Sequence, residues 1–391
     1  MVRLGVESLV ERRASSIAGE RVGLITNPSG VDRDLTPTID LLYDHPNLDL
    51  RTLFAPEHGI RGNVQADVTV EESVDEHTGL PVRSLYGEHK TRLDEMIADL
   101  DVLVYDMQDV GCRFYTLIYT LAHALRGVAS AGKRLVVLDR PNPVAPVSPT
   151  GNTATGGTSS VAGDNGLPVV HGMTVGELAH YFNHQFGIDA DLEVVEIEGW
   201  DRSTWFDETD LPWVLPSPNM PTLTTATVYP GTGFFEGTNL SEGRGTTRPF
   251  ELIGAPWIDG EEWAAHLNEQ GLPGVGFRPA YFTPMFSKHE RKDIEGVQVH
   301  VLDRDVIDPV AVGVTMLITA FNGYSESEWL RHDGGYFIDE LASGSYLRKA
   351  IDGADPSVEP IEMYNGISEY WEDDIASFAA ARERHALYPA N

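Results

Sequence analysis

Basic residues are scarce in this 391-residue chain, which holds 28 Lys and Arg against 60 Asp and Glu and has a formal net charge of −32. A surface this acidic repels nucleic acid and anionic membranes, so both are poor candidates as partners. The acids are spread along the chain rather than gathered in a tail. Such a surface suits concentrated salt, which screens self-repulsion, and predicts a halophile with a salty cytoplasm; an acidic mesophile protein is the alternative.

Cysteine is also nearly absent, since Cys112 is the single one. An internal disulfide is therefore excluded, and an oxidising compartment is not required. The first fifteen residues lack the basic and apolar segments of a secretory signal. No apolar run approaches the ~20 residues needed to cross a bilayer. We expect a cytoplasmic protein, and the sequence leaves its oligomeric state open.

Several chemical motifs are missing as well. The chain has no G-x-x-x-x-G-K-[ST] loop, no G-x-G-x-x-G after its first predicted strand, and no G-x-S-x-G, H-E-x-x-H or Cys/His cluster. These absences argue against a nucleoside triphosphatase, a dinucleotide enzyme, a serine esterase and a zinc hydrolase.

The residues that are present predict an α/β protein of two domains, as the length alone suggests. The first half alternates short apolar runs with amphipathic stretches, which is typical of a parallel sheet covered by helices. Thr174 and Glu177 have the spacing of a capping box at the start of a helix. The expected strands are 21–27, 50–57, 82–86, 102–108, 135–140 and 192–198, and the expected helices are 36–44, 91–99, 116–131 and 174–186.

The composition changes after Trp200. Residues 215–221 contain three prolines and must be extended, and residues 228–249 are dense in Gly, Thr and Glu. A second α/β pattern follows, with a helix at 260–270, a strand at 296–302, a helix at 309–320 and a helical tail. We expect a catalytic domain over residues 1–230, a smaller auxiliary α/β domain over 231–391, and a cleft between them.

Ligands bind outside the carboxyl ends of the strands in open parallel sheets. The turns that follow the predicted strands are polar and contain Gly or Pro, and three of the four most informative ones carry a carboxylate. The candidates at these strand ends are Asn27, Glu57, His58, Arg61, Asp106, Gln108, Asp109 and Asp139.

Paired carboxylates suit glycosidic hydrolysis, which needs a protonated carboxyl near the leaving oxygen and a second group that assists attack. Glu57 is the best candidate for the acid, because the apolar residues 53–55 before it can raise its pKa by desolvation. A helix cap or a pair with Arg61 is the structural alternative. Asp106 and Asp109 are candidates for the second group, whereas Asp139 beside Arg140 suits a structural pair equally well.

Other polar residues suit substrate binding. Arg113 and Tyr115 follow the Gly111 turn and can bind a carboxylate or hydroxyls. His58 and His171 can donate to a sugar, with loop stabilisation as the alternative for each.

A second polar cluster spans residues 236–246 and includes Glu236, Asn239, Glu242 and Arg244. In a helix the two glutamates would be about 240° apart, so they would not share a face. We therefore expect a loop with one acid turned inward. The cluster lies at the expected domain junction, a preferred place for a substrate cleft.

Long motifs now identify a family. The stretches GLITNPSGVD (23–32), LFAPEHGIRG (53–62), YDMQDVGCRFYT (105–116), VLDRPNP (137–143), HGMTVGELA (171–179), PSPNMPTL (216–223), EGTNLSEGRGTTRPFELIGAPW (236–257) and GVQVHVLDR (296–304) occur in order along the chain. In these motifs the chain resembles the NamZ-type exo-β-N-acetylmuramidases, glycoside hydrolase family 171, formerly a domain family of unknown function. The −32 charge indicates a haloarchaeal-like member.

The resemblance implies a Rossmann-like first domain, a smaller second domain and a cleft between them. It also implies release of N-acetylmuramic acid from the non-reducing ends of peptidoglycan fragments, without a metal or organic cofactor. Glu57 of the PEHG motif looks like the catalytic residue of the family. By position we add Asp106, Asp109 and Glu242 as catalytic candidates. The expected substrate contacts include Asn27, Gln108, Asp139, Asn219, Glu236, Asn239 and Arg244. Arg61, Arg113 and Arg244 are candidates for binding the lactyl carboxylate.

Two alternatives stay open at this point. The chain resembles a family whose members are often exported, and haloarchaea are expected to lack murein, so salvage of imported muropeptides or cleavage of another N-acetylhexosamine glycoside is conceivable. A protein that binds or senses amino sugars without turnover is the alternative from another class.

Overall fold

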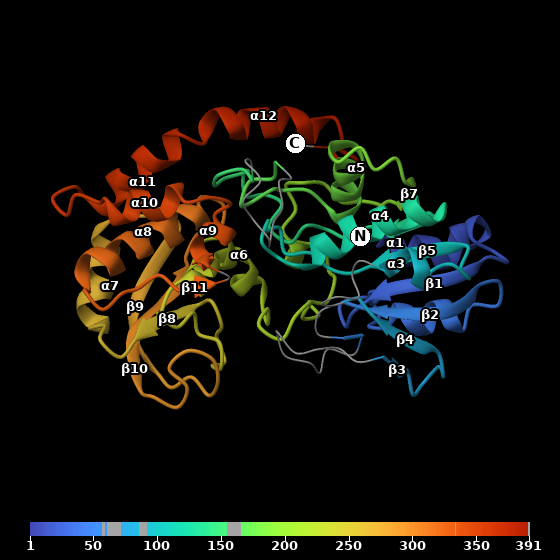
Figure 1. Cartoon of the computed structure of the whole chain (residues 1–391), viewed down its shortest axis with the longest axis horizontal. Coiled ribbons are helices and arrows are strands. Elements are labelled where there is room, and N and C mark those ends of the chain that lie inside the picture. Colours follow the sequence, from blue (N-terminus) through green and yellow to red (C-terminus); the bar gives the residue numbers. More distant parts are fainter. Residues whose placement is uncertain (57–58, 61–71, 86–91, 155–165, 333, 390–391) are drawn as a thin grey trace.

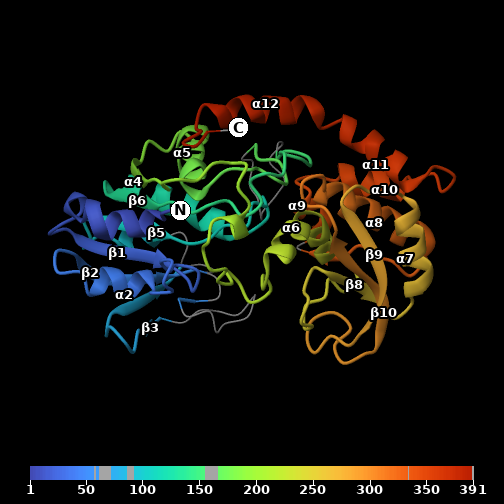
Figure 2. The ribbon, with the colours of Figure 1, turned by 180° about the vertical axis from the view of Figure 1, so that it is seen from behind.

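The computed structural model describes residues 1–56, 59–60, 72–85, 92–154, 166–332 and 334–389. It shows two regions joined near α6 (Figures 1 and 2). The first region is built on a large sheet and contains the N-terminus. The second is smaller, and the C-terminal helix α12 arches from it back over the first. Glu57, His58 and Arg61 lie outside the described residues.

The large sheet has seven strands in the order β3-β4-β2-β1-β5-β6-β7. All neighbouring strands pair in parallel except β3, which is antiparallel to β4. Without β3, the order is that of the dinucleotide-binding fold, so the Rossmann-like prediction is confirmed. The strands are β1 Arg21–Thr26, β2 Asp49–Ala55, β3 Ser73–Val74, β4 Pro81–Ser84, β5 Val102–Asp106, β6 Arg134–Leu138 and β7 Asp191–Val195.

Alternate residues of the central strands feed two hydrophobic clusters, one on each face of the sheet. Val102 and Val104 of β5 belong to one cluster, whereas Leu103 and Tyr105 belong to the other. Burial on both faces explains the continuous apolar runs in the sequence. The helices of this region are α1 Gly5–Ser8, α2 Thr38–Tyr43, α3 Leu93–Met96, α4 Leu117–Ala131 and α5 Val175–Gln185, with the short helices η1 Leu9–Arg13, η2 Ala14–Ser16 and η4 Phe206–Glu208.

The predicted start of α5 is confirmed in atomic detail. The Thr174 hydroxyl accepts a hydrogen bond from the Glu177 amide at 3.2 Å, and the Glu177 carboxylate accepts one from the Thr174 amide at 2.9 Å. Two otherwise unpaired amides at the helix start are thereby satisfied.

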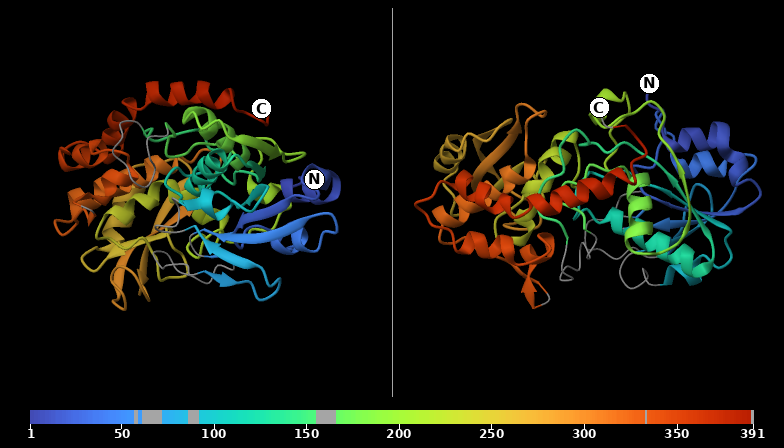
Figure 3. Two further views of the ribbon diagram at one scale, coloured as in Figure 1. Left: turned by 45° about the vertical axis from the view of Figure 1, so that its right-hand side comes forward. Right: turned by 90° about the horizontal axis from the view of Figure 1, so that it is seen from above.

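The second region contains an antiparallel sheet in the order β8-β10-β9, with helices packed on it (Figure 3). The helix predicted at 260–270, the strand at 296–302 and the helix at 309–320 are confirmed as α7, β10 and α8. The elements are α6 Leu223–Thr232, η5 Gly233–Gly237, β8 Leu252–Ala255, α7 Gly260–Glu269, β9 Val275–Phe282, β10 Ile294–Val301, α8 Pro309–Gly323, β11 Arg331–His332, β12 Gly335–Tyr336, α9 Phe337–Leu341, α10 Tyr346–Asp352, α11 Pro360–Glu369 and α12 Glu372–Glu383.

Proline concealed two elements of this region from sequence analysis. β9 contains Pro279 and tolerates it because β9 is an edge strand of its sheet. α6 contains Pro230 and Gly231 near its end, in a stretch for which the sequence predicted no helix. There α6 crosses α8 so closely that a Cβ on Gly231 would lie 1.8 Å from the Pro309 carbonyl oxygen. Tertiary packing therefore keeps the helix where local propensity disfavours it.

The C-terminal tail packs on the first region although it follows the second in sequence. The Leu387 amide donates to the Glu177 carboxylate at 2.9 Å, and Tyr388 is buried in the core beneath the large sheet. The boundary proposed at residue 230 stays a prediction. No helix among the described residues is long and apolar enough to span a bilayer.

Candidate active site

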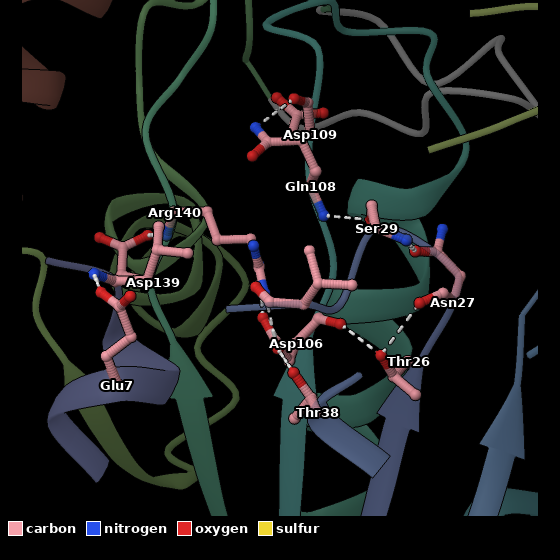
Figure 4. Close-up of polar contacts among 12 residues, drawn as sticks. Glu7, Thr26, Asn27, Ser29, Thr38, Asp106, Gln108, Asp109, Asp139 and Arg140 are labelled. Carbon is pink, nitrogen blue, oxygen red and sulfur yellow. Dashed lines mark hydrogen bonds and ion pairs between the residues drawn. The ribbon is translucent and has the colours of Figure 1, made fainter. Parts of the chain in front are cut away.

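The strand ends of the large sheet converge where β1 and β5 lie side by side (Figure 4). The order of the strands reverses here: from β1 the chain continues to β2 and β4 on one side, and from β5 it continues to β6 and β7 on the other. Such a switch point is where open α/β sheets bind ligands. Thr26 ends β1 and Asp106 ends β5, and the Thr26 hydroxyl donates to the Asp106 carbonyl at 2.8 Å. The strand-end rule therefore located a real convergence of polar side chains.

Asp106 is closed off from any ligand. Its carboxylate forms a bidentate pair with Arg140, at 2.5 Å to Nε and 2.9 Å to Nη2, and also accepts from the Thr38 hydroxyl. Asp106 is 0% exposed, and the Arg140 side chain is 5% exposed. Arg140 donates in addition to the Val31 carbonyl. Both carboxylate oxygens are thus occupied, so this geometry favours a structural role and gives no support to the catalytic prediction.

Asp139 lies at the end of β6 but does not pair with the Arg140 guanidinium. It accepts from the Gly176 amide at 2.7 Å, the Thr174 hydroxyl at 2.7 Å and the Tyr388 hydroxyl at 2.5 Å. Burial raises the pKa of Asp139 to about 7, although these hydrogen bonds lower it. Asp139 links α5 and the C-terminal tail to the sheet. Its side chain is fully buried, so it is not placed to contact a substrate.

Asn27 and Gln108 join neighbouring turns. The Asn27 amide donates to the Pro216 carbonyl at 3.0 Å, and its oxygen accepts from the Ser29 amide at 3.0 Å. The Gln108 amide nitrogen donates to the Pro141 carbonyl at 2.8 Å. A small hollow opens beside them, lined in part by Ser29, Gln108 and Arg140. Its other walls are Leu4, Val31, Asp32, Phe206, Leu211, Pro212 and Val214.

Asp109 and His171 form a buried pair beyond β5. His171 Nε2 lies 3.3 Å from Asp109 Oδ2, which also accepts from the Gly111 amide at 2.8 Å. His171 Nδ1 accepts from the Met173 amide at 3.2 Å, whereas Nε2 is buried without a hydrogen-bond partner among the described residues. Asp109 Oδ1 is buried without a hydrogen-bond partner among the described residues. The structure thus brings together two predicted residues, at a position that is closed to solvent.

Arg113 serves as a strut between the two regions. The fully buried guanidinium donates to the carbonyls of Asn152, Leu167 and Leu341, the last of which belongs to α9. Burial lowers the pKa of Arg113 to about 10. Carbonyls of the chain itself hold this cation, so it is not placed to receive a lactyl carboxylate. Tyr115 is also buried, and its ring centroid lies 6.1 Å from that of Tyr229 on α6.

The second cluster lies where η5 leaves α6, at the boundary between the two regions. Arg244 contacts both glutamates, with Nη2 2.6 Å from Glu236 Oε1 and Nε 3.3 Å from Glu242 Oε1. Lys288 completes the cluster at 2.8 Å from Glu242 Oε2. We expected a loop with one acid turned inward. Glu236 instead lies in the short helix η5, and both acids contact the same cation, Arg244.

The pKa values of Glu236 and Arg244 are both raised, but for different reasons. Burial raises the pKa of Glu236, which Arg244 lowers and Glu242 raises further. Burial would lower the pKa of Arg244, but the two glutamates raise it above its ordinary value. Its guanidinium also lies 5.2 Å from the centroid of the Phe250 ring.

The remaining predicted contacts are less informative. Asn239 is held by the chain: its amide nitrogen donates to the Glu326 carbonyl at 2.8 Å, and its oxygen accepts from the Glu328 amide at 2.9 Å. Asn219 is buried in the proline-rich segment. Among the described residues, no cluster of three or more His, Cys, Asp or Glu side chains suits a metal ion. Since Glu57 and His58 lie outside this set, the metal-free site stays a prediction.

Family models match nearly the whole chain: the N-terminal model of the exo-beta-N-acetylmuramidase NamZ covers residues 22–224, and the C-terminal model covers residues 227–388. The chain belongs to the NamZ exo-β-N-acetylmuramidase family. The peptidoglycan beta-N-acetylmuramidase NamZ of Bacillus subtilis (strain 168) is 45% identical over 387 residues, which cover 99% of this chain and 91% of that protein.

Solved structures share the NamZ-family fold. A DUF1343 family protein from Bacteroides fragilis NCTC 9343 is 34% identical, with a TM-score of 0.88 and 99% of each chain covered. A second DUF1343 family protein from the same organism is 27% identical, with a TM-score of 0.78 and 100% of each chain covered.

Sequence analysis missed Thr38 and Lys288 at this NamZ-family site and assigned Arg140 the wrong partner. Thr38 and Arg140 saturate Asp106, and Lys288 neutralises Glu242. Arg140 was paired with the wrong neighbour because we considered sequence adjacency rather than the lateral pairing of β5 and β6. Lys288 lies in the β9–β10 connection, and nothing in the sequence relates it to Glu242 at a distance of 46 positions.

Proposed function

We propose that this chain is an exo-acting glycoside hydrolase that releases N-acetylmuramic acid, or a related N-acetylhexosamine, from the non-reducing ends of peptidoglycan fragments. The observation that carries the proposal is the 45% identity to the peptidoglycan beta-N-acetylmuramidase NamZ of Bacillus subtilis across 99% of this chain. A likeness of this extent covers both the large sheet and the second region.

In this proposal Glu57 protonates the leaving oxygen. The assignment rests on the PEHG motif, and the residue itself lies outside the described structure. The chemistry needs a second group on the far side of the anomeric carbon. The carboxylates at the boundary between the two regions, Glu236 and Glu242, supply candidates for it. The proposed reaction uses no metal or organic cofactor.

The lactyl carboxylate of muramic acid requires a cation. Of the three arginines that we considered, Arg113 is bound to backbone carbonyls and Arg244 is already shared by two glutamates. Arg61 follows PEHG and is the remaining candidate. We therefore propose Arg61 for this contact.

We also propose that the protein works in the salty cytoplasm of a halophile and salvages cell-wall fragments. The −32 charge supports the salt requirement, and the buried, unpaired Cys112 needs no oxidising compartment. Partners other than a small carbohydrate are not part of this proposal.

The deciding experiment measures hydrolysis of a chromogenic β-N-acetylmuraminide and the matching glucosaminide in molar salt. The wild type should cleave the muraminide, and Glu57→Gln should lower kcat by about 10²–10⁴-fold, as loss of a general acid does. Glu72→Gln, at an exposed position, is the matched control.

The outcomes separate the alternatives. Failure to cleave either glycoside would refute the muramidase proposal, and calorimetric binding of N-acetylmuramic acid without turnover would favour the sugar-binding alternative. Undiminished cleavage by Glu57→Gln would remove Glu57 from the mechanism. A fall in affinity for the muraminide but not the glucosaminide in Arg61→Met is the result expected for the lactyl contact.

A further inference from the structure

We infer that Glu236 is the carboxylate that accepts the proton of the attacking water, and that Glu242 is a positioning residue that holds Arg244 and Lys288 beside it. The inference rests on the proposed glycosidase function. It exchanges the roles that the sequence suggested, in which Glu242 was catalytic and Glu236 bound substrate.

The two glutamates differ in how their oxygens are used. Glu242 is 3% exposed at its side chain and pairs through Oε1 with Arg244 and through Oε2 with Lys288. The Glu236 side chain is 17% exposed, and only its Oε1 is bound, by Arg244 at 2.6 Å. No described residue donates a hydrogen bond to Glu236 Oε2. Glu236 therefore keeps one oxygen for a water or a sugar hydroxyl. Glu242 Oε2 also accepts no hydrogen bond in the described structure, but it is buried and lies against the Lys288 ammonium.

Glu236 is also held firmly in position. It lies in η5, where a Cβ on Gly233 would come within 2.6 Å of the Phe114 ring and one on Gly237 within 2.7 Å of the Ile338 amide. Lys288 donates to the carbonyls of Phe235 at 2.7 Å and of Glu236 at 3.3 Å. Such support on both sides places the carboxylate reproducibly, as a reacting group requires.

Lys288 reaches this position through a strained loop. Three of the four residues nearest to it in the 287–291 segment have left-handed backbone angles without being glycine: Ser287 at φ 71°, His289 at φ 57° and Arg291 at φ 57°. His289 is fixed by a contact of 2.8 Å between Nε2 and the Asn239 carbonyl. Strain of this kind persists only where surrounding structure enforces it, and it concentrates at functional sites.

Several charges act on Glu236. Arg244, Glu242 and Lys288 act directly, while Tyr229 and Cys112 pack nearby as neutral groups. Burial raises its pKa and makes the carboxylate a stronger base, while the charge of Arg244 opposes that rise. A positioned base of this kind is what the attacking water needs.

The reaction balances with these groups alone. The water oxygen forms a bond to the anomeric carbon, and one water proton moves to the Glu236 carboxylate. The bond from the anomeric carbon to the leaving oxygen breaks, its electron pair stays on that oxygen, and the proposed acid Glu57 supplies the proton. One water is consumed, and proton exchange with solvent restores both glutamates.

The test compares Glu236→Gln with Glu242→Gln in molar salt on the chromogenic muraminide. Glu236→Gln should lower kcat by about 10²–10⁴-fold with little change in KM, and should lose the acid limb of the pH–rate profile. Formate, a small carboxylate, should restore part of the rate to Glu236→Ala. Glu242→Gln should keep the acid limb and lose less kcat, with a lower melting temperature.

Each outcome bears on the inference. A kcat for Glu236→Gln within threefold of the wild type would overturn it, as would an acid limb that survives in Glu236→Gln and disappears in Glu242→Gln. Glu236→Asp keeps the charge and provides a second variant should the glutamine form fold poorly. A wild type that cleaves no glycoside would instead count against the proposed function.

Discussion

Two arginine–carboxylate pairs stand in different surroundings in this molecule. Asp106–Arg140 lies at the end of β5, with side chains 0% and 5% exposed. Glu236–Arg244 lies at the boundary between the two regions, with side chains 17% and 20% exposed. In the first pair both carboxylate oxygens are bound by Arg140, and Thr38 adds a further bond. In the second pair one oxygen is bound within the described structure and one is left for a ligand.

The difference shows why a carboxylate at a strand end is an incomplete signal for catalysis. A saturated, dry pair organises the turn around it, and its removal exposes an uncompensated charge. An unsaturated pair at the edge of solvent can exchange a partner for substrate. Among the described acids, Asp106 has both carboxylate oxygens bound and Glu236 has one, and the proposed roles of the two residues follow from this difference.

The largest effect is expected for Asp106→Asn. It leaves the Arg140 cation buried without its partner, so the free energy of unfolding should fall by about 3–5 kcal/mol. The measurement is chemical denaturation in molar salt. The fraction that remains folded should cleave the substrate with an unchanged kcat, because the buried Asp106 carboxylate is already bound by Arg140 and Thr38.

Asp101→Asn is the control for that experiment. Its exposed pair with Arg21 has side chains 38% and 47% exposed and should contribute at most about 1 kcal/mol. A loss of kcat in Asp106→Asn without a loss of stability would break the comparison and restore Asp106 to the catalytic group.

Asp139 is a buried carboxylate that has hydrogen-bond donors but no cation as partners. Its pKa is raised by burial to about 7, above the value of 3.8 that it would have unfolded. The folded protein therefore holds this proton more tightly, so the stabilising contribution is complete below about pH 4 and is lost as pH rises towards 7. The greatest loss expected is about 4 kcal/mol.

Asp139→Asn should remove this pH dependence. Stability curves of the wild type and the variant, measured between pH 4 and 8, should lie closest at low pH and separate as pH rises, because only the wild type then carries a buried ionised carboxylate. Parallel curves would show that Asp139 is ionised throughout and that its hydrogen bonds with Thr174 and Tyr388 outweigh burial.

The strands of the large sheet were predictable because strands buried on both faces appear in the sequence as continuous apolar runs. Each of the six parallel strands of the large sheet coincides with a predicted run, and the α5 start was predicted from Thr174 and Glu177. The elements that it missed depend on packing rather than local preference. Pro279 is tolerated only because β9 is at an edge, and Gly231 is required only because α8 crosses there.

The candidate site was predicted at the level of turns and not of partners. Asn27, Gln108, Asp109 and His171 do lie in connected turns, since parallel strands end at one edge. Which oxygen is occupied depends on residues from elsewhere in the chain, such as Lys288 on Glu242. Such contacts leave no periodic trace in a single sequence.

Arg244→Gln probes the open pair. Arg244 lowers the pKa of Glu236, so its removal should raise that pKa and move the acid limb of the pH–rate profile to higher pH. A displacement of one pH unit corresponds to about 1.4 kcal/mol and to a roughly tenfold lower rate on the acid side. Arg248→Gln is the matched control, since Arg248 is half exposed and pairs with Glu251. An unmoved acid limb would separate Arg244 from the reacting group.

Salt gives the finest distinction between buried and exposed charge. The Debye length is about 3 Å at 1 M salt and about 10 Å at 0.1 M, so dilution strengthens repulsion across a surface whose net charge is −32. The melting temperature should therefore fall on dilution, and an unchanged value would contradict the proposed halophile. The stability difference between wild type and Asp106→Asn should stay nearly constant, because solvent ions do not reach a pair whose side chains are 0% and 5% exposed. If that difference also changed with salt, solvent ions would reach the Asp106–Arg140 pair. The two pairs would then differ only in how much they are exposed, and not in whether a ligand can reach them.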